Sequence, residues 1–365
     1  GFCRKHNIPS AETQGGKSSL PADEKLNLGA LGVTGTEAAN TLAAEADVIL
    51  AVGTRLQDFT SGSRALFAER GRTILGLNVQ AFDAGKHHAS PLVCDAKTGL
   101  AALARGLAGW RAPAEWAVKA ELAQEHWQRQ AAPYTAPTES SLPSDAKVIG
   151  AVQRQSKKTD IIVCAAGGLP GELHKLWQAG KPGGYHVEYG YSCMGYEIAG
   201  GLGAKMAAPD REVIVMVGDG SYLMMNSEIA TSVMLGLKLT IVVLDNRGFG
   251  CINRLQRATG GESFNNLLEH TRHETLPAID FAKHAASLGA KAIKVAGIAA
   301  LEKTLRTARR SPITTTIVID TDPLKSTDAG GTWWDVAVPE VSTRPEVRAA
   351  RAGYVEAQKK QRLGD

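Results

Sequence analysis

Continuous apolar runs of five to seven residues recur along the chain and predict buried strands. Segments that are mostly apolar occupy residues 47–53, 73–79, 161–165, 213–217, 239–244 and 314–319, and a shorter pattern with two lysines, KAIKV, occupies 291–295. Strands buried on both faces are apolar throughout, which is typical of parallel sheets. Apolar residues with helical spacing lie between the runs, at residues 37–46, 96–107, 194–207, 222–235, 277–288 and 298–309. This alternation predicts an α/β fold with parallel sheets.

The same pattern predicts how the chain divides into domains. The predicted segments are a Rossmann-like domain (1–110), a polar linker (111–145), a second parallel-sheet domain (146–330) and a tail with a charged helix (331–365). The linker holds a helix over 114–130 and then three prolines, at 133, 137 and 143. The first residues, GFCRKHNIP, resemble the end of a helix, so we expect an incomplete first domain within a longer polypeptide.

Two polar turns follow strands that we expect to be neighbours. The run 213–217 ends at GDGS (218–221), and the run 239–244 is followed by DNRG (245–248). A right-handed crossover through the intervening helix brings both strand ends to one edge of the sheet. Mg²⁺ prefers oxygen ligands, and Asp219, Asn246 and the carbonyl of Gly248 supply a carboxylate, an amide oxygen and a backbone oxygen.

The residues around Asp219 favour a phosphate beside that metal. Gly218 and Gly220 let the backbone approach a phosphate closely, and Ser221 begins a helix whose N-terminal amides attract anions. The alternative is two sharp turns in an ordinary βαβ unit. The paired spacing of the two turns favours a Mg²⁺–diphosphate site.

Other glycine-rich segments offer further candidates. After the run 161–165, amides around Gly168 and Gly171 can hold a diphosphate from the opposite side. Glu172 and His174, at the start of the next helix, are further candidates for cofactor binding; His174 can contact phosphate or substrate, with a polar surface position as the alternative. The alternative for this segment is a packing turn. Residues 29–35 are also glycine-rich, but no strand is predicted close before them, which favours a loop over a nucleotide site.

Three polar residues, His186, Glu188 and Tyr189, precede the segment SCMGY (192–196). Their side chains are candidates for contacts with substrate hydroxyls. A solvated loop is the alternative interpretation.

The segment from GDG (218–220) to DN (245–246) resembles the fingerprint of thiamine diphosphate (ThDP) enzymes, which ends in NN. The resemblance implies ThDP as cofactor, with Mg²⁺ held by Asp219, Asn246 and Gly248. It also implies that Ser192 and Met194 belong to the cofactor-binding segment, where Met194 supports the bent shape of the bound cofactor.

Further stretches resemble one subgroup of that family, the 3D-(3,5/4)-trihydroxycyclohexane-1,2-dione hydrolases of myo-inositol catabolism. These stretches are residues 12–17, 28–36, 171–177, 249–253 and 331–336. The implied reaction is hydrolytic C–C ring opening of the cyclic diketone to 5-deoxy-D-glucuronate. An acetolactate synthase-like or decarboxylating ThDP enzyme, or a non-catalytic ThDP-binding fragment, remains an alternative.

The resemblance also implies a partner. ThDP enzymes of this group use a glutamate from an N-terminal pyrimidine-binding domain, normally of a neighbouring subunit, and no such domain lies within residues 1–365. We therefore expect no catalytic residue to be identifiable here. We expect a homodimer or homotetramer, and no turnover by these residues alone.

Charge, cysteine content and hydropathy restrict the partners and the cellular compartment that we expect for this chain. The net charge of +4 is small and spread along the chain, so we expect neither a nucleic-acid nor a membrane partner. The five cysteines have no CxxC spacing, which favours reduced thiols in the cytoplasm. We find no apolar stretch near the ~20 residues of a membrane span and no signal peptide.

Overall fold

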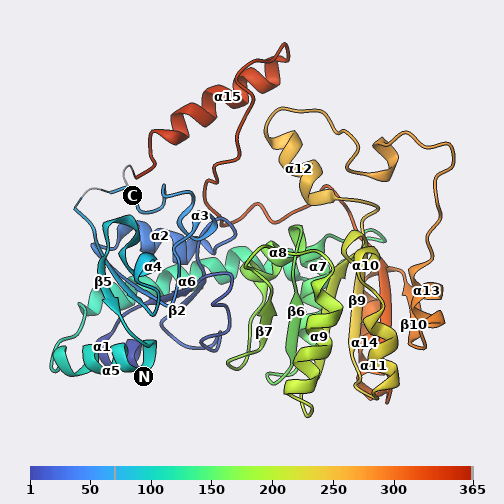
Figure 1. Ribbon diagram of the computed structural model, residues 1–365, viewed down its shortest axis with the longest axis horizontal. Coiled ribbons are helices and arrows are strands. Elements are labelled where there is room, and N and C mark those ends of the chain that lie inside the picture. Colours follow the sequence, from blue (N-terminus) through green and yellow to red (C-terminus); the bar gives the residue numbers. More distant parts are fainter. Residues whose placement is uncertain (70, 363–365) are drawn as a thin grey trace. The chain divides into compact units, whose positions relative to one another are not determined.

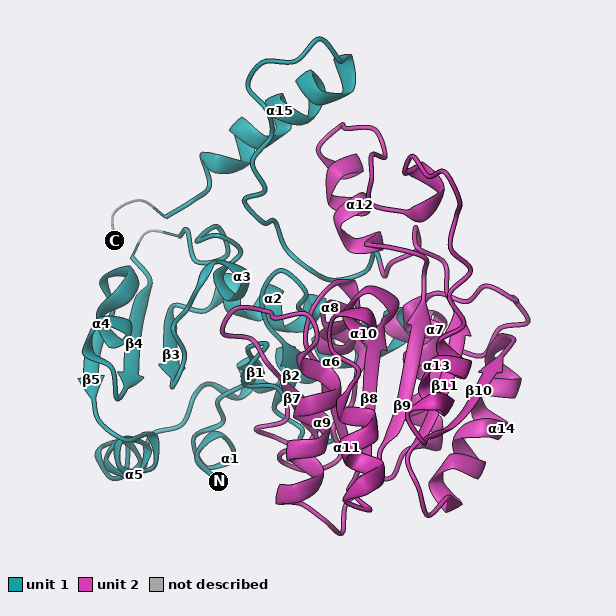
Figure 2. Cartoon of the chain, turned by 45° about the vertical axis from the view of Figure 1, so that its right-hand side comes forward, with its two compact units in different colours: residues 1–17, 23–130, 328–365 teal, residues 18–22, 131–327 magenta. Residues whose placement is uncertain are grey.

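The computed structural model describes residues 1–69 and 71–362, which pack into two compact units (Figure 2). Unit 1 comprises Gly1–Lys17, Asp23–Gln130 and Asp328–Asp365, and unit 2 comprises Ser18–Ala22 and Ala131–Thr327. Strands in the described chain pair in parallel, and helices connect them. The predicted α/β class with parallel sheets is therefore confirmed.

Unit 1 holds a sheet of order β3-β4-β5 and a separate pair, β1-β2. Its strands are β1 (Ser10–Glu12), β2 (Asn27–Ala30), β3 (Val48–Val52), β4 (Thr73–Asn78) and β5 (Ser90–Val93). Its helices are α1 (Phe2–His6), α2 (Glu37–Glu45), α3 (Asp58–Ser61), α4 (Ala81–Gly85), η1 (Lys86–His88), α5 (Ala96–Gly106) and α15 (Pro345–Gln358). Helix α6 (Ala114–Thr135) leads from this unit into unit 2.

Unit 2 is built on a six-stranded sheet of order β10-β11-β9-β8-β6-β7 (Figure 1). Its strands are β6 (Ile161–Cys164), β7 (Tyr185–Val187), β8 (Val213–Gly218), β9 (Thr240–Asp245), β10 (Lys291–Val295) and β11 (Thr315–Asp320). Its helices are α7 (Asp145–Gln155), α8 (Gly168–Leu176), α9 (Tyr196–Ala207), α10 (Asp219–Met224), α11 (Glu228–Met234), α12 (Gly250–Ala258), η2 (Leu268–His270), α13 (Phe281–Ser287) and α14 (Gly297–Arg310).

The central strands of unit 2 are apolar because helices cover them. Strands β6 and β9 are buried along their whole length, and β8 is buried up to Gly218. One core cluster packs Val215 and Val243 with Ile198 of α9, Ile229 of α11 and Phe281 of α13. The edge strand β10 is largely exposed, as its lysines require.

The topology of this sheet determines where a ligand can bind. From β6 the chain moves outward to β7, then returns to β8 and continues in the other direction through β9. The strand order therefore reverses between β6 and β8. In open parallel sheets ligands bind beyond the carboxyl ends of the strands at such a reversal.

The structure corrects two predicted helices. The helix predicted over 222–235 is two helices, α10 and α11, because Met225 is extended and Asn226 Nδ2 donates to Tyr222 O at 3.0 Å. The linker helix α6 continues to Thr135 and contains Pro133, which removes one backbone hydrogen bond without ending the helix.

The structure adds short strands to those predicted, and it assigns the C-terminal tail to one of the two units. Strands β1, β2, β5 and β7 span only three or four residues each and were not predicted. Strand β2 lies at the start of the glycine-rich segment 29–35, whose Gly32 packs against the backbone of Phe59 and Thr60. The tail belongs to unit 1, where the Asp335 N–H donates to Ser63 Oγ at 2.9 Å, and its residues 363–365 lie outside the described residues.

Among the described residues, no helix combines the length and the apolar character needed to cross a bilayer.

Candidate functional site

The two predicted metal-binding turns lie side by side at the carboxyl edge of the unit 2 sheet. Strands β8 and β9 are neighbours, and Gly218 pairs with Leu244 in their register. Asp219 begins α10 directly after β8, and Asn246 directly follows β9. The Gly248 N–H donates to Asp219 Oδ2 at 2.9 Å, so the two turns are in contact.

The oxygen atoms of this edge fit a divalent cation. Asn246 Oδ1 is buried and has no hydrogen-bond donor among the described residues. A buried acceptor without a partner costs about 1–3 kcal/mol, which a bound cation offsets. Burial, together with the charge of Asp245, raises the pKa of Asp219 to about 7. A Mg²⁺ ion would reverse that penalty, because it stabilises the carboxylate.

The backbone at Gly248 accepts only glycine. Its φ is +145°, and a Cβ atom there would overlap the carbonyl oxygen of Asn266 and lie 2.9 Å from Leu267 Cα. An antiparallel bridge joins Gly248 and Leu267, and the Phe249 N–H donates to Asn266 O at 2.6 Å. The segment around Leu267 therefore holds in place the Gly248 backbone, whose N–H contacts Asp219.

The turn at Gly220 is closely covered by two apolar side chains. A Cβ atom on Gly220 would lie 3.3 Å from Met194 Cε and 2.8 Å from Phe249 Cε1. The structure thus brings Met194, which precedes α9, to the start of α10. Phe249 was not identified as a site residue from the sequence, because only the fold brings the end of the DNRGF segment onto Gly220.

The second glycine-rich turn also lies at the strand-order reversal. Gly167, with φ of +88°, caps α8, and Gly168 is the first residue of that helix. The Arg254 guanidinium of α12 lies against Gly168, and its Nη1 donates to Pro323 O at 2.6 Å. Arg254 adds a positive charge beside this turn, and the sequence alone did not identify it.

The other predicted cofactor-binding residues of α8 are Gly171, Glu172 and His174, and two of them are engaged or buried within unit 2. The Glu172 carboxylate accepts hydrogen bonds from the Thr327 N–H at 2.9 Å and from the Thr327 hydroxyl. His174 is fully buried, and Gly171 lies between them and the helix start. Cofactor roles for these three residues stay predictions.

The loop before α9 is organised by a carboxylate. Glu188 accepts hydrogen bonds from the Tyr191 N–H at 3.0 Å and from the Cys193 N–H at 2.7 Å. Ser192, in this loop, has a φ of +56°. His186 belongs to β7, and its Nε2 is 2.6 Å from the Tyr196 hydroxyl.

Glu197 is, like Arg254, a charged residue of this region that was not identified from the sequence. It lies in the first turn of α9 with 1% of its surface exposed. Ser221 donates to its Oε1 at 2.8 Å. The sequence did contain a signal for Glu197, because a charged residue is unusual within a segment of small and apolar residues such as YEIAGGLG, which is typical of a buried helix.

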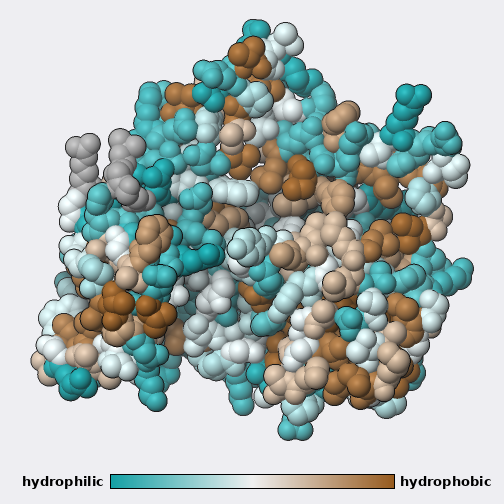
Figure 3. Space-filling model, in the orientation of Figure 1, coloured by the Kyte–Doolittle hydropathy of each residue, from teal (hydrophilic) through white to brown (hydrophobic). Residues whose placement is uncertain are grey.

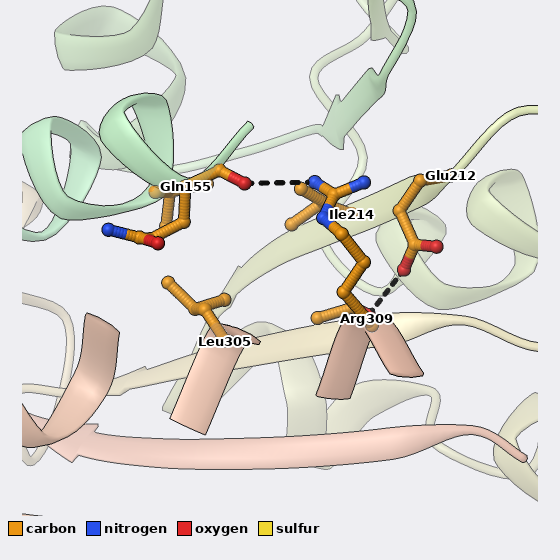
Figure 4. Close-up of a pocket in the computed structure, with 7 residues that line it drawn as sticks. Gln155, Glu212, Ile214, Leu305 and Arg309 are labelled. Atoms are coloured by element: carbon orange, nitrogen blue, oxygen red, sulfur yellow. Dashed lines mark hydrogen bonds between the residues drawn. The ribbon is translucent and has the colours of Figure 1, made fainter. Parts of the chain in front are cut away.

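A small cavity in unit 2 lies away from these turns (Figure 4). It lies beside the residues at which β8 and β9 begin, where Thr240 Oγ1 donates to Glu212 Oε1 at 2.7 Å. Arg309 Nη2 donates to Gln155 O at 3.0 Å across it. The polar groups that line this cavity form hydrogen bonds with one another, which is typical of a structural role.

Comparisons with known proteins agree with this geometry. Residues 1–103 match the central domain of thiamine pyrophosphate enzymes, and residues 165–319 match their C-terminal TPP-binding domain. The second match contains both of the turns that are predicted to bind a metal.

Curated relatives carry a more specific name. The chain is 38% identical over 380 residues to 3D-(3,5/4)-trihydroxycyclohexane-1,2-dione hydrolase 2 of Bacillus cereus. It is 40% identical over 378 residues to 3D-(3,5/4)-trihydroxycyclohexane-1,2-dione hydrolase of Geobacillus thermodenitrificans. Each alignment covers 96% of this chain but only 59% and 58% of the respective relative. The chain therefore belongs to the thiamine pyrophosphate enzyme family, of which it carries the central and the C-terminal TPP-binding domains.

Proposed function

We propose that the complete polypeptide containing this chain is a ThDP- and Mg²⁺-dependent hydrolase of myo-inositol degradation. Its substrate would be 3D-(3,5/4)-trihydroxycyclohexane-1,2-dione, opened by hydrolytic C–C cleavage to 5-deoxy-D-glucuronate. The observation that carries this proposal is the 38–40% identity, over 96% of the chain, to hydrolases of that name.

In this proposal Asp219, Asn246 and the Gly248 carbonyl hold Mg²⁺, and the glycine-rich turns approach the diphosphate. The unpartnered Oδ1 of Asn246 supports this assignment. Bound ThDP supplies an electron sink for the C–C cleavage. The residues described here bind and orient the cofactor, while Met194 and Phe249 cover the Gly220 turn.

We further propose that a pyrimidine-binding domain of a neighbouring subunit supplies the activating glutamate, in a homodimer or homotetramer. Exposed apolar side chains form two groups: Leu223, Met224 and Met225 at the end of α10, and Met234 and Leu235 at the end of α11. Hydrophobic patches are visible on this side of the molecule (Figure 3). Such clusters are typical of interfaces. A cytoplasmic location is part of the proposal, since all five cysteines are free.

The test is NMR analysis of the products that the complete polypeptide forms from the trihydroxylated dione with Mg-ThDP. Appearance of 5-deoxy-D-glucuronate supports the hydrolase. Conversion of pyruvate to acetolactate with the dione unchanged would indicate an acetolactate synthase-like enzyme. Binding of Mg-ThDP without turnover of either substrate would indicate a non-catalytic ThDP-binding protein.

A further inference from the structure

One buried carboxylate connects three segments that border the candidate cofactor site. Glu197 Oε1 accepts hydrogen bonds from the Ser221 hydroxyl at 2.8 Å and from the Ala166 N–H at 3.4 Å. Its Oε2 accepts from the Gly195 N–H at 3.1 Å. These donors belong to the turn after β6, the loop before α9 and the start of α10. Glu197 therefore joins both glycine-rich turns to the loop that carries Met194.

This network fixes the role of the Ser221 hydroxyl. The Gly195 N–H also lies 3.0 Å from Ser221 Oγ, which accepts from it. A hydroxyl carries a single proton, and Ser221 donates that proton to the Glu197 carboxylate. The Ser221 side chain consequently has no proton left for a phosphate oxygen. Its predicted contribution to diphosphate binding then comes from its backbone N–H.

The network also controls the direction of Met194. The N–H that Glu197 and Ser221 share belongs to the peptide bond between Met194 and Gly195. Gly195 has a φ of +91°, and a Cβ atom there would lie 3.1 Å from Met225 Cβ. The N–H of the peptide bond that follows Met194 thus has two acceptors. From this position Met194 extends to Gly220, where its Cε lies 3.3 Å from the place that a Cβ atom on Gly220 would occupy.

We propose that Glu197 is a positioning residue for the thiamine part of the cofactor. It holds the Met194–Gly195 peptide and the Ser221 hydroxyl, so that Met194 supports the organic portion of ThDP. The diphosphate is held separately, by the metal at Asp219, Asn246 and Gly248. This inference rests on the proposed binding of Mg-ThDP and adds a residue that acts through Met194.

The test compares two ligands on the complete polypeptide by titration calorimetry: Mg-ThDP and inorganic Mg-pyrophosphate. In Glu197→Gln one of the two carboxylate oxygens becomes an NH₂ donor, which faces either the Gly195 N–H or the Ser221 hydroxyl and the Ala166 N–H. In either orientation one of these donors loses its acceptor, so the Met194 loop shifts. We expect the affinity for Mg-ThDP to fall at least ~10-fold, and the affinity for Mg-pyrophosphate to change less than ~3-fold. The near-isosteric glutamine preserves volume, and a thermal unfolding curve checks that the variant is folded.

The matched control is Glu212→Gln. Glu212 also bonds a hydroxyl, that of Thr240, and an ammonium, that of Lys238, but it precedes β8 at the opposite end of the strand from Asp219. Glu212→Gln is expected to leave both affinities unchanged. A fall in both affinities for Glu197→Gln, or in neither, would overturn the inference.

A double-mutant cycle tests whether Glu197 acts through Met194. If it does, Glu197→Gln weakens Mg-ThDP binding much less in a Met194→Ala background than in the wild type. Additive effects of the two substitutions would overturn the positioning role. Failure of the wild type to bind Mg-ThDP would instead refute the proposed function, and this inference with it.

Discussion

Replacing Gly248 by alanine tests whether its backbone carbonyl serves the metal site. The substitution must adopt a φ of +145° and move the added Cβ away from backbone atoms of Asn266 and Leu267. Side chains rarely adopt such backbone angles, which cost about 1–3 kcal/mol. Relief of the overlap would separate Gly248 from Leu267 and break the hydrogen bond from the Phe249 N–H to Asn266 O, at about 1 kcal/mol.

These contributions give about 3 kcal/mol as the cost of restoring the binding conformation, which corresponds to a loss of roughly 100-fold in affinity. Titration calorimetry with Mg-ThDP measures that loss directly. The melting temperature should fall much less, because the strained segment 246–268 can rearrange while the sheet stays intact.

The matched control is Gly236→Ala, after α11. Gly236 also has a positive φ, of +65°, but an added Cβ would meet no atom within 4 Å. It should lower stability by about 1–2 kcal/mol without changing Mg-ThDP affinity. If Gly248→Ala bound Mg-ThDP as tightly as the wild type, the assignment of its carbonyl to the metal would be wrong.

Three further substitutions have clear expected outcomes. Asp219→Ala removes the only carboxylate assigned to the metal and should abolish Mg-ThDP binding in calorimetry; retained affinity would contradict the metal site. Burial raises the pKa of Asp145 to about 6, so its ionised form destabilises the fold increasingly as pH rises from about 4 to 6. Asp145→Asn should therefore raise the melting temperature at pH 7–8 and not below pH 4, and an equal change at both would exclude this cause. Arg309→Met leaves the buried carboxylate of Asp160 without its ion pair and should cost about 3–5 kcal/mol in urea unfolding, whereas less than 1 kcal/mol would show that Asp160 finds another partner.

Local sequence patterns were sufficient to locate the longer strands of the unit 2 sheet and to select Asp219 and Asn246 as candidate metal ligands. The runs at 213–217 and 239–244 became β8 and β9 within one residue at each end, because burial on both faces requires continuous apolar sequence. Asp219 and Asn246 could be placed together because parallel strands end at the same edge. Shorter strands such as β2 and β7 lack enough residues for a pattern, and the break after Met224 depends on a local bond of Asn226.

The sequence by itself determined the fold class, the two turns that we predict to bind a metal and the resemblance to ThDP enzymes, because strand runs and turn residues are local in the chain. Tertiary structure alone decided that Phe249 covers Gly220, that Arg254 lies against Gly168, and that Glu197 joins Ala166 to Ser221. Glu197 and Ser221 are 24 positions apart, and Glu197 and Ala166 are 31 apart. No periodicity relates residues at such separations, so only the packing of α9 against the sheet can bring them into hydrogen-bonding distance.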